Sequence, residues 1–374
     1  MKKVLQIGKF YPILGGVEKV MWDVTTSLNR AGVHCDMLCA KFPKDAVSEE
    51  DAASIDGHLV TCRTLAECAG TMIAPSMVTW LRKHCKEYEI IHIHHPDPMA
   101  ALALRLSGYK GNVVLHWHSD IISQKVGLAF YLPLQRWLIR RASAVIGTTP
   151  VYLEESPYLS DCTAPKIPVP IGITPVHFDS ARAAEIRDRY KGRHIVLSVG
   201  RLVPYKGYDT LIRAASLLSE DYEFVISGTG PLSDSLSAQA QSLGVSDRVH
   251  FLGRLDDDDL HTYMAACDVF ALTSSMKTEA FGIVQIEAFS LGKPVVSTRI
   301  PGSGVSWVNS DGVSGLTVPV NDADAVATAI RKICEDGALR SALGQGAAAR
   351  FAEMFDIEIM KNKIINVYEN CFNF

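Results

Sequence analysis

Short runs of apolar and β-branched residues alternate along the chain with longer segments of helical periodicity. KVLQIG at 3–8 is the first such run, a helical pattern follows from about 17 to 29, and an apolar run returns at 33–40. A strand, a loop, a helix and a second strand in this order predict the start of a parallel, doubly wound α/β sheet. The same patterns predict further helices near 75–86 and 127–142 and further strands at 90–94, within 112–120 and within 143–150.

A second series of the same kind follows a proline-rich stretch, KIPVPIGI at 166–173, which we interpret as an interdomain linker. Residues 41–70 are polar and irregular and carry no recognisable element. Strands of the second series are predicted within 194–202, 223–232, 249–255, 268–275 and 294–298. Both halves therefore read as doubly wound α/β domains, with a binding cleft expected between them. We place the domains at 1–175 and 176–355 and expect a C-terminal helix, 356–374, that packs back on the first domain.

Length and charge agree with a two-domain globular protein. The 374 residues exceed one typical core, and 48% hydrophobic and 21% charged residues are ordinary usage. The net charge of −4 gives no indication of nucleic-acid binding. The charge is uneven, with +2 over residues 1–175 and −6 over the remainder. A mildly basic first half suits an acidic acceptor or an anionic lipid surface.

The chain shows no sign of secretion or of a membrane span. Its nine cysteines lack a C-x-x-C pair, which favours free thiols in a reducing compartment. The start of the chain lacks the pattern of a signal peptide, and no apolar run reaches the ~18 residues of a spanning helix. We expect a cytoplasmic protein. The basic helix at 127–142, with Arg136, Arg140 and Arg141, is either a core-packing helix with a solvated face or a contact to the inner membrane surface.

Two consecutive predicted strands end in polar residues. The residues are His94, His95 and Asp97 after the first strand and His116, His118, Ser119 and Asp120 after the second. Ligands of open α/β sheets bind beyond the carboxyl ends of the strands, so we expect these side chains to line a site. A metal site is the rival hypothesis, but no partner at helical spacing completes a ligand set, and we predict none.

The segment 273–298 combines a loop, a helix and a buried strand. Glu279 lies in the loop, the helix runs from about Ile283 to Leu291, and Glu287 lies on it, eight positions after Glu279. The N–H groups near Gly282 have no partner in the first turn of a helix and suit an anion. Carboxylates on both sides of an anion site suit a ligand with hydroxyls at both ends and phosphate between them, as in a nucleotide sugar.

Further candidate groups lie at loop and helix starts. Gly15 and Gly16 precede the first helix, where a side chain would obstruct a closely approaching phosphate, although a plain glycine turn is equally consistent. Four aspartates, 256–259, open another helix, and we interpret them as capping residues rather than metal ligands.

These motifs together resemble the retaining glycosyltransferases of family 4. They are G-G at 15–16, H-x-H-S-D at 116–120, V-G-R-L-x-x-x-K-G at 199–207, G-x-G-P at 228–231 and E-x7-E at 279–287. The resemblance spans nearly the whole chain and is strongest over 195–320. It implies the GT-B architecture, two Rossmann-like doubly wound parallel-sheet domains facing across a cleft, with the acceptor bound by the first and the nucleotide-sugar donor by the second.

The resemblance also implies roles for single residues. Arg201 and Lys206 resemble the pair that binds the donor diphosphate, and Glu279 the carboxylate that holds the donor sugar. Glu287 resembles the residue that binds the ribose, and His118 the histidine near the transferred sugar. The other implied donor contacts are Gly15, Gly16, Gly228, Phe281, Gly282, Ile283 and Val284.

The sequence of the segment 301–316 resembles the corresponding segment of bacterial O-antigen and exopolysaccharide enzymes, many of which are mannosyltransferases that use GDP-mannose. We therefore expect mannose transfer from GDP-mannose to a polyprenyl-diphosphate-linked saccharide, without cofactor or metal. Ser306 stands where many relatives carry a glutamate, which leaves donor recognition open. The alternatives are a UDP-sugar-dependent transferase (GlcNAc, Glc or Gal), a GT-B-shaped sugar-nucleotide epimerase and a non-catalytic binding protein. A nicotinamide oxidoreductase is disfavoured because the first βα turn lacks the three-glycine fingerprint.

Overall fold

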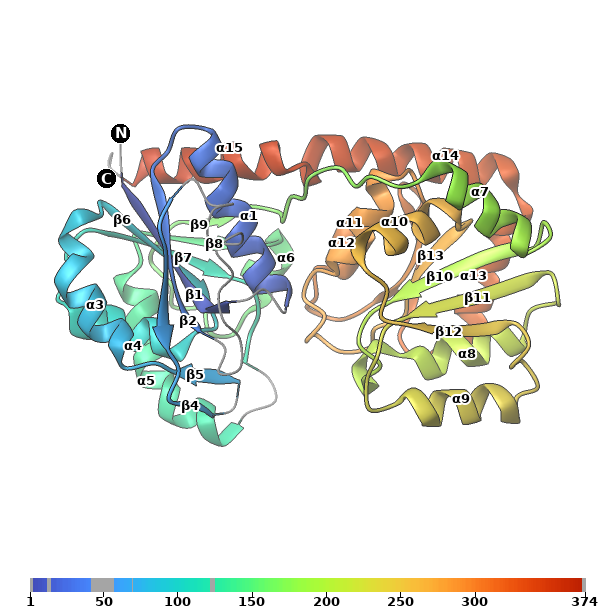
Figure 1. Cartoon of the computed structure of the whole chain (residues 1–374), viewed down its shortest axis with the longest axis horizontal. Helices are drawn as coiled ribbons and strands as arrows, with labels where there is room; N and C mark the ends of the chain where they lie inside the picture. The colour runs from blue at the N-terminus through green and yellow to red at the C-terminus, as the bar shows by residue number, and fades with distance from the viewer. Residues whose placement is uncertain (1–2, 12–14, 42–56, 69, 122–124, 372–374) are drawn as a thin grey trace. The chain divides into compact units, whose positions relative to one another are not determined.

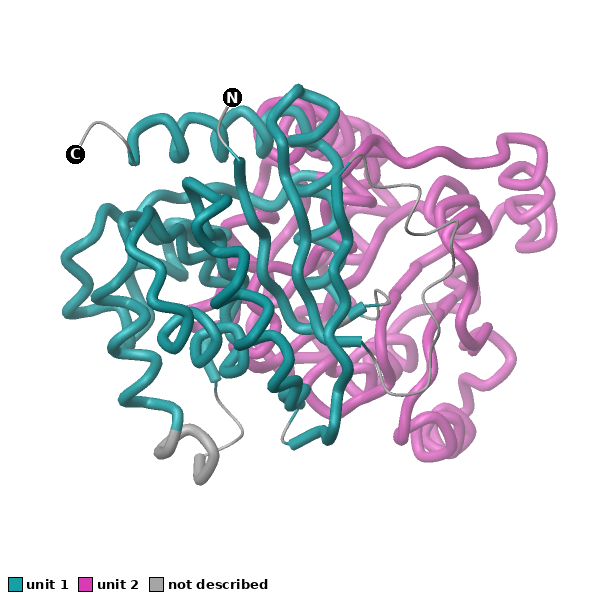
Figure 2. Tube along the Cα trace, turned by 60° about the vertical axis from the view of Figure 1, so that its left-hand side comes forward, with its two compact units in different colours: residues 1–172, 357–374 teal, residues 173–356 magenta. Residues whose placement is uncertain are grey.

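The computed structural model describes residues 3–11, 15–41, 57–68, 70–121 and 125–371. The chain divides into two compact units (Figure 2). Unit 1 comprises Met1–Gly172 and Ile357–Phe374, and unit 2 comprises Ile173–Asp356. The chain thus leaves unit 1 once and returns to it for its last helix.

Unit 1 is built on a seven-stranded parallel sheet of order β3-β2-β1-β6-β7-β8-β9 (Figure 1). The strands are β1 (Val4–Tyr11), β2 (Cys35–Lys41), β3 (Leu59–Arg63), β6 (Ile90–His95), β7 (Asn112–Trp117), β8 (Ala144–Gly147) and β9 (Lys166–Pro168), and β4 (Ala66–Cys68) and β5 (Thr71–Ile73) form a separate antiparallel pair. The helices are α1 (Gly16–Arg30), α3 (Ser76–His84), the short η1 (Cys85–Glu87), α4 (Pro98–Ser107), α5 (Lys125–Arg141), α6 (Pro150–Glu155) and α15 (Ile357–Asn370).

Unit 2 contains a six-stranded parallel sheet of order β12-β11-β10-β13-β14-β15. The strands are β10 (His194–Val199), β11 (Tyr222–Ser227), β12 (Val249–Gly253), β13 (Val269–Leu272), β14 (Val295–Arg299) and β15 (Gly315–Pro319). The helices are α7 (Ser180–Arg189), the turn η2 (Pro204–Lys206), α8 (Tyr208–Ser216), α9 (Ser233–Ser242), α10 (Asp257–Ala266), α11 (Ile283–Ser290), α12 (Val305–Val308), α13 (Ala323–Glu335), α14 (Gly337–Arg350) and the π-helical turn η3 (Phe351–Phe355).

Both sheets reverse their strand order near the middle. The reversal lies between β1 and β6 in unit 1 and between β10 and β13 in unit 2. At such a switch point the loops leave the sheet in opposite directions and open a crevice at the carboxyl ends of the strands. Helices cover both faces of each sheet, so central strands such as β6 and β11 are buried along their whole length. The predicted α/β class with two Rossmann-like units is confirmed.

Two sequence interpretations were wrong. The stretch 166–173 is not entirely a linker, because β9 pairs in parallel with β8 at the edge of the sheet, where a proline is tolerated. The stretch 41–70 is not entirely irregular, because β3 pairs with β2 from Leu59 to Arg63. Strands β3 and β9 are short and are stabilised by pairing with β2 and β8, so their own sequences give only a weak strand pattern.

The C-terminal helix α15 lies against α1 on one face of the unit 1 sheet (Figure 1). Its residue Tyr368 accepts a hydrogen bond from Gln6 of β1, with Nε2 and the phenol oxygen 2.9 Å apart. The last helix is therefore part of the core of unit 1, although 362 residues separate the two bonded side chains.

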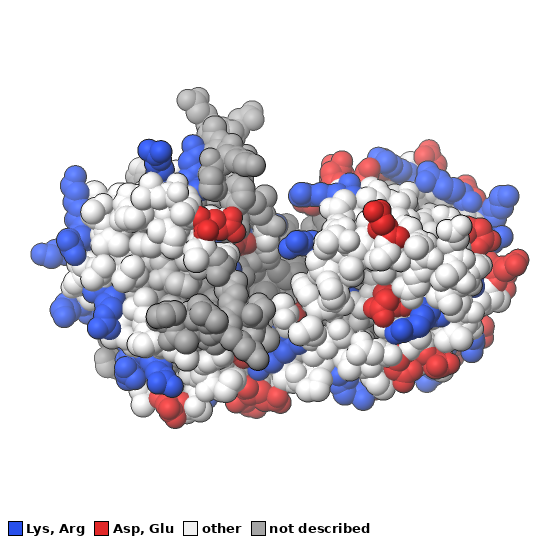
Figure 3. Space-filling model, turned by 90° about the horizontal axis from the view of Figure 1, so that it is seen from below, with Lys and Arg blue, Asp and Glu red and all other residues white. Residues whose placement is uncertain are grey.

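The charged helices have ordinary structural roles. Asp256 caps α10 by accepting a hydrogen bond from the N–H of Asp259 at 2.8 Å, which confirms the capping interpretation of the acidic run. On α5, Leu138 and Ile139 are buried while Arg136 and Arg140 are exposed. Basic side chains are scattered over the face of unit 1 in Figure 3, and both signs are mixed on unit 2. Among the described helices, none has the length and apolar character needed to cross a membrane.

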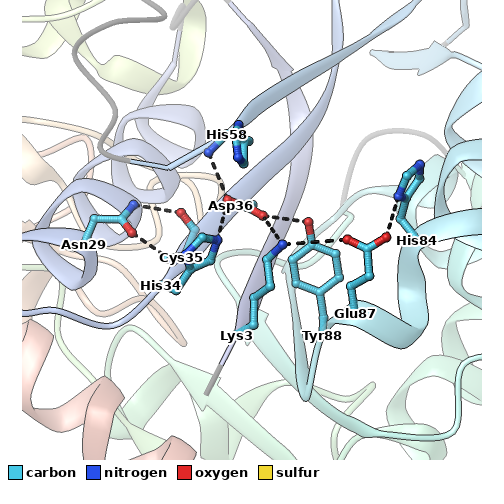
Figure 4. A network of polar contacts seen from close by, with 9 residues as sticks. All are labelled: Lys3, Asn29, His34, Cys35, Asp36, His58, His84, Glu87 and Tyr88. Atoms are coloured by element: carbon cyan, nitrogen blue, oxygen red, sulfur yellow. Dashed lines mark hydrogen bonds and ion pairs between the residues drawn. The ribbon is translucent and has the colours of Figure 1, made fainter. Parts of the chain in front are cut away.

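A polar network fastens β2 to its neighbours around the buried Asp36 (Figure 4). The Asp36 carboxylate accepts hydrogen bonds from the Tyr88 hydroxyl at 2.7 Å and the His58 N–H at 2.9 Å, and Lys3 lies 3.2 Å away. Burial raises the pKa of this carboxyl, but these donors outweigh burial and leave the pKa below its usual value. Asp36 is therefore held as a buried, fully paired anion.

We expect Asp36→Ala to lower the free energy of unfolding by about 3 kcal/mol, because buried donors lose their acceptor. Urea denaturation followed by circular dichroism measures this. Glu87→Ala is the matched control: Glu87 belongs to the same network, 3.7 Å from Lys3, but its side chain is half exposed, and little change is expected. Equal effects of the two substitutions would show that burial of the network contributes nothing.

Candidate functional site

The predicted donor residues of unit 2 gather at its switch point. Arg201 and Lys206 follow β10, Gly228 follows β11, and Glu279 follows β13. These three strands are adjacent in the order β11-β10-β13. Parallel strands present their carboxyl ends at one edge, so residues up to 78 positions apart in sequence lie at the same edge of the sheet.

Lys206 and Glu279 form an ion pair at the centre of this group. Nζ of Lys206 lies 2.5 Å from Oε2 of Glu279, and the side chains are each 12% exposed. The Ser274 hydroxyl donates to the same carboxylate oxygen at 2.8 Å. The ammonium also lies 5.7 Å from the ring centroid of Tyr205. An ammonium and a carboxylate are thus both fixed in position at the carboxyl edge of the sheet.

The loop that carries Glu279 is held from the segment 301–304. The Ser303 hydroxyl donates to the carbonyl of Glu279, and the Gly304 N–H donates to that of Ala280 at 2.9 Å. The sequence analysis missed Ser274 and Ser303 as supports of the site. Ser274 follows β13 directly, so the rule of polar strand ends identifies it; Ser303 has no comparable local signal.

The start of α11 offers free backbone donors. Gly282 is the N-cap residue with φ of 73°, and it has no side chain to cap the helix. A Cβ at this position would lie 2.7 Å from the end of the Leu272 side chain, which would have to shift, and the positive φ disfavours any residue other than glycine. Ile283 and Val284 form the first turn of α11, whose N–H groups suit an anion, and Glu287 follows half-buried on the same helix.

Phe281 supports this turn from the core. Its ring is 3% exposed and packs edge-on against Phe355 with centroids 5.9 Å apart. Any ligand contact from Phe281 must therefore come from its backbone.

Arg201 and Gly228 lie at the same carboxyl edge of the unit 2 sheet. Arg201 is exposed and, among the described residues, forms no ion pair, so its guanidinium is available to an anion. Gly228 packs directly on the backbone of Gly200, where a Cβ would lie 1.9 Å from the carbonyl oxygen. Gly200 in turn leaves room for the Lys206 side chain, whose Nζ would lie 3.3 Å from a Cβ there.

Of the predicted site residues, Gly15, Gly16 and His118 lie in unit 1. Gly15 is the N-cap of α1 and Gly16 its first residue, and both are exposed. The preceding loop residues 12–14 lie outside the described residues. His118 directly follows β7 and is 5% exposed.

Most of the predicted histidine lining is buried instead. His94, His95 and His116 are 0% exposed, because β6 and β7 are central strands covered on both faces. Asp97 caps α4 by accepting from the N–H groups of Met99 and Ala100 at 2.9 and 3.0 Å. The interpretation of these four residues as site lining was wrong.

Asp120 also has an internal role. Its carboxylate accepts from the Trp117 indole at 2.9 Å and from the Ser156 hydroxyl at 2.7 Å. It fixes the loop that follows His118 to β7 and to the end of α6.

The buried imidazoles approach the spacing of a metal site. One ligand atom each from His92, His94 and His116 lies within 4.8 Å of the others. The donor set does not suit a cation, because both ring nitrogens of His94 are hydrogen-bonded and the group has no carboxylate to balance the charge. Burial, followed for His92 and His94 by neighbouring histidines, lowers the pKa of all three, so the rings are neutral at pH 7.

The protein has two Rossmann-like units, and the second has paired charges and an uncapped helix start at its switch point. These features define the class of GT-B glycosyltransferases. Residues 179–350 match the model of glycosyl transferases group 1, and residues 14–155 match that of glycosyltransferase family 4. The chain is 31% identical over 360 residues to the D-rhamnosyltransferase WbpZ of Pseudomonas aeruginosa, covering 94% of this chain and 92% of the relative. The chain belongs to this glycosyltransferase family and is a sugar-transferring enzyme.

Other relatives extend over the whole chain. The O-antigen chain mannosyltransferase C of Escherichia coli is 29% identical over 370 residues, 98% of each protein. Among solved structures, Anabaena HepE in complex with UDP has a TM-score of 0.79 at 22% identity, over 98% of this chain and 100% of that one. Sucrose-phosphate synthase from Thermosynechococcus elongatus has a TM-score of 0.80 at 23% identity, over 98% and 99%. The structural likeness supports the GT-B fold.

Proposed function

We propose that this glycosyltransferase transfers mannose from GDP-mannose to a polyprenyl-diphosphate-linked saccharide, with retention of the anomeric configuration. The observation that carries the proposal is the full-length similarity to an O-antigen chain mannosyltransferase, together with the charge arrangement at the unit 2 switch point. A relative described as a GDP-mannose-dependent mannosyltransferase, from Mycobacterium tuberculosis, is 29% identical over 374 residues and supports the same donor.

The donor diphosphate is held, in this proposal, by Arg201, Lys206 and the first turn of α11. Lys206 pairs with Glu279 in the structure. An incoming diphosphate offers the ammonium a more highly charged partner, while the sugar hydroxyls donate to Glu279 in its place. Glu287, on the same helix, accepts hydrogen bonds from the ribose hydroxyls. When the donor replaces the ion pair in this way, the Lys206 ammonium and the Glu279 carboxylate both keep a polar partner.

The same residues stabilise the departing nucleoside diphosphate. As the bond between the anomeric carbon and the phosphate oxygen breaks, negative charge grows on the diphosphate, and the cations of Lys206 and Arg201 and a helix N-terminus stabilise it. The acceptor oxygen attacks on the same face, and its proton passes to the leaving phosphate oxygen. These groups supply the positive charge that a metal ion supplies in other transferases, so we propose a metal-independent reaction.

A donor screen tests the function. Purified protein is incubated with GDP-mannose, UDP-glucose, UDP-GlcNAc, UDP-galactose and dTDP-sugars, with and without a polyprenyl-diphosphate saccharide, and released nucleoside diphosphate is measured. We expect release of GDP from GDP-mannose, stimulated by the acceptor and unaffected by EDTA. Release of UDP alone would identify a UDP-sugar as the donor in place of GDP-mannose. UDP is the nucleotide in the HepE structure. An isomerised sugar nucleotide without acceptor would indicate an epimerase.

Contact with the membrane is a further part of the proposal. The exposed Arg136 and Arg140 of α5 are the basic groups that would face anionic lipid. Sedimentation with phosphatidylglycerol vesicles, compared with phosphatidylcholine vesicles, tests this. Equal binding to both would leave α5 as a purely structural helix with a solvated face.

A further inference from the structure

Five buried side chains form a continuous hydrogen-bonded chain beneath the carboxyl edge of the unit 1 sheet. They are Gln6 of β1, His92 and His94 of β6, His118 after β7 and Tyr368 of α15. Gln6 pairs with His92 across β1 and β6, and alternation along the strands places Gln6, His92, His94 and His118 on one face. The chain connects the C-terminal helix to the one histidine assigned to the active site.

The distances define the order of the contacts. The Tyr368 phenol oxygen lies 2.9 Å from Nε2 of Gln6 and 2.6 Å from Nδ1 of His92. Oε1 of Gln6 lies 2.8 Å from Nε2 of His94. Nδ1 of His94 lies 2.8 Å from Nε2 of His118. All three imidazoles are neutral at pH 7, since burial, followed by neighbouring histidines, lowers each pKa.

This order fixes where each proton lies. The amide nitrogen of Gln6 donates to Tyr368, so its oxygen faces His94 and can only accept. His94 must then carry its proton on Nε2, and its Nδ1 is an acceptor. His118 donates to that nitrogen from Nε2, which leaves Nδ1 of His118 as a bare lone pair. Within the described residues, Nδ1 of His118 has no hydrogen-bond partner.

We propose that Tyr368, Gln6 and His94 are positioning residues that hold His118 in the Nε2–H tautomer, with Nδ1 as an acceptor for a sugar hydroxyl. In this tautomer Nδ1 accepts a hydrogen bond from a hydroxyl, whereas in the other tautomer the Nδ1–H group would donate one. Tyr368 determines the outcome because its hydroxyl orients the Gln6 amide. The use of the lone pair for a sugar rests on the proposed function, but the tautomer itself does not.

Tyr368→Phe removes the hydroxyl that orients Gln6. The amide can then turn its NH₂ group toward Nε2 of His94, which reverses the proton order and moves the His118 proton to Nδ1. We expect a mixture of His118 tautomers and a fall in kcat of roughly tenfold with KM for the nucleotide donor unchanged, the scale for losing a partner that orients a working imidazole. Gln6→Leu, which removes the acceptor of His94, is expected to act in the same direction.

Two-bond ¹H–¹⁵N correlation spectra of ¹⁵N-histidine-labelled protein report the tautomer directly. His118 is assigned as the signal absent from His118→Asn. We expect an Nε2–H ring in the wild type. His116→Phe is the matched control, because His116 stacks on His118 with centroids 4.0 Å apart but forms no hydrogen bond among the described residues. Its expected spectrum retains the Nε2–H form of His118.

The outcomes separate the proposed control of the His118 tautomer by Tyr368, Gln6 and His94, here called the relay, from the proposed function. An Nδ1–H ring in the wild type, or an unchanged tautomer in folded Tyr368→Phe, would overturn the relay even if mannose transfer is observed. The expected tautomers without turnover of any donor would leave the relay standing and reject the function. A tautomer lost equally in His116→Phe would show that packing, not the hydrogen-bonded chain, decides the proton position.

Discussion

Replacing Lys206 with alanine is expected to lower kcat/KM for the nucleotide donor by about 10²- to 10³-fold, the usual loss for one preorganised group that stabilises a developing charge. Nζ of Lys206 is 2.5 Å from Glu279 and only 12% of its side chain is exposed, so the ammonium is already desolvated and aimed. The substitution removes a cation from the diphosphate and leaves Glu279 with Ser274 as its remaining partner. Glu279→Ala is expected to reduce turnover by a similar factor, through the sugar rather than the phosphate.

The control is another lysine of the same sheet. Lys293 is also half-buried and donates to the Cys267 carbonyl at 3.0 Å, but it precedes β14 and so lies at the amino end of the strands. Lys293→Ala should therefore leave kcat/KM unchanged. Steady-state kinetics with the donor identified in the screen measures all three variants, and circular dichroism establishes that each is folded. Full turnover by Lys206→Ala on that donor would remove Lys206 from the site.

Acidification is expected to destabilise unit 1 well above the range in which carboxylates titrate. Burial lowers the pKa of His95 and His116 to about 3 and, followed by neighbouring charges, holds those of His92, His94 and His118 well below 6.5. In the unfolded chain the same rings take up protons near pH 6.5. The unfolded state thus binds more protons, so the free energy of unfolding falls as the pH drops from 6.5 toward 3.

The free energy of unfolding depends steeply on pH because the contributions of the five histidines add. Each neutral histidine contributes about 1.4 kcal/mol per pH unit below its unfolded pKa, so five rings contribute roughly 7 kcal/mol per unit, comparable with the whole stability of a domain. Four of the five tryptophans lie in 1–172, so urea denaturation followed by tryptophan fluorescence at pH 7.5, 6.5 and 5.5 reports mainly on unit 1. His116→Phe should reduce the slope by one proton. A stability of unit 1 independent of pH in this range would mean that the rings are charged or hydrated in the native state.

The carboxyl edge of the unit 2 sheet illustrates what local pattern can predict. Arg201 lies at the end of its predicted strand, Lys206 and Glu279 lie a few residues beyond theirs, and in a parallel sheet the carboxyl ends of neighbouring strands lie at one edge. The glycine at 282, followed by a helical period, likewise indicated an uncapped helix start before the structure placed it. Donor identity could not be predicted in this way, because it depends on which side chains approach the base and the sugar.

The histidines after β6 and β7 illustrate the limit. The same strand-end rule assigned His94, His95 and His116 to a site lining, yet they are buried in the core. A strand pattern shows which residues share a face but not what covers that face. Here α15, distant in sequence, supplies Tyr368 as a hydrogen-bond partner of His92 on the face of His94 and His116, while His95 points to the other face, where its ring lies 6.2 Å from that of Tyr131 of α5. The hydrogen bond from the Ser303 hydroxyl to the Glu279 carbonyl likewise joins residues that are distant in sequence and could not be predicted from a local pattern.

The sequence by itself determined the alternation of strands and helices, the class of the fold and the charged residues that lie at the carboxyl edge of the unit 2 sheet, because strand ends, helix starts and glycine turns are local features. The tertiary structure alone decided which polar strand ends reach the surface, how the last helix joins unit 1, and how His118 is hydrogen-bonded. These depend on contacts across up to 362 residues, for which a single sequence carries no local signal.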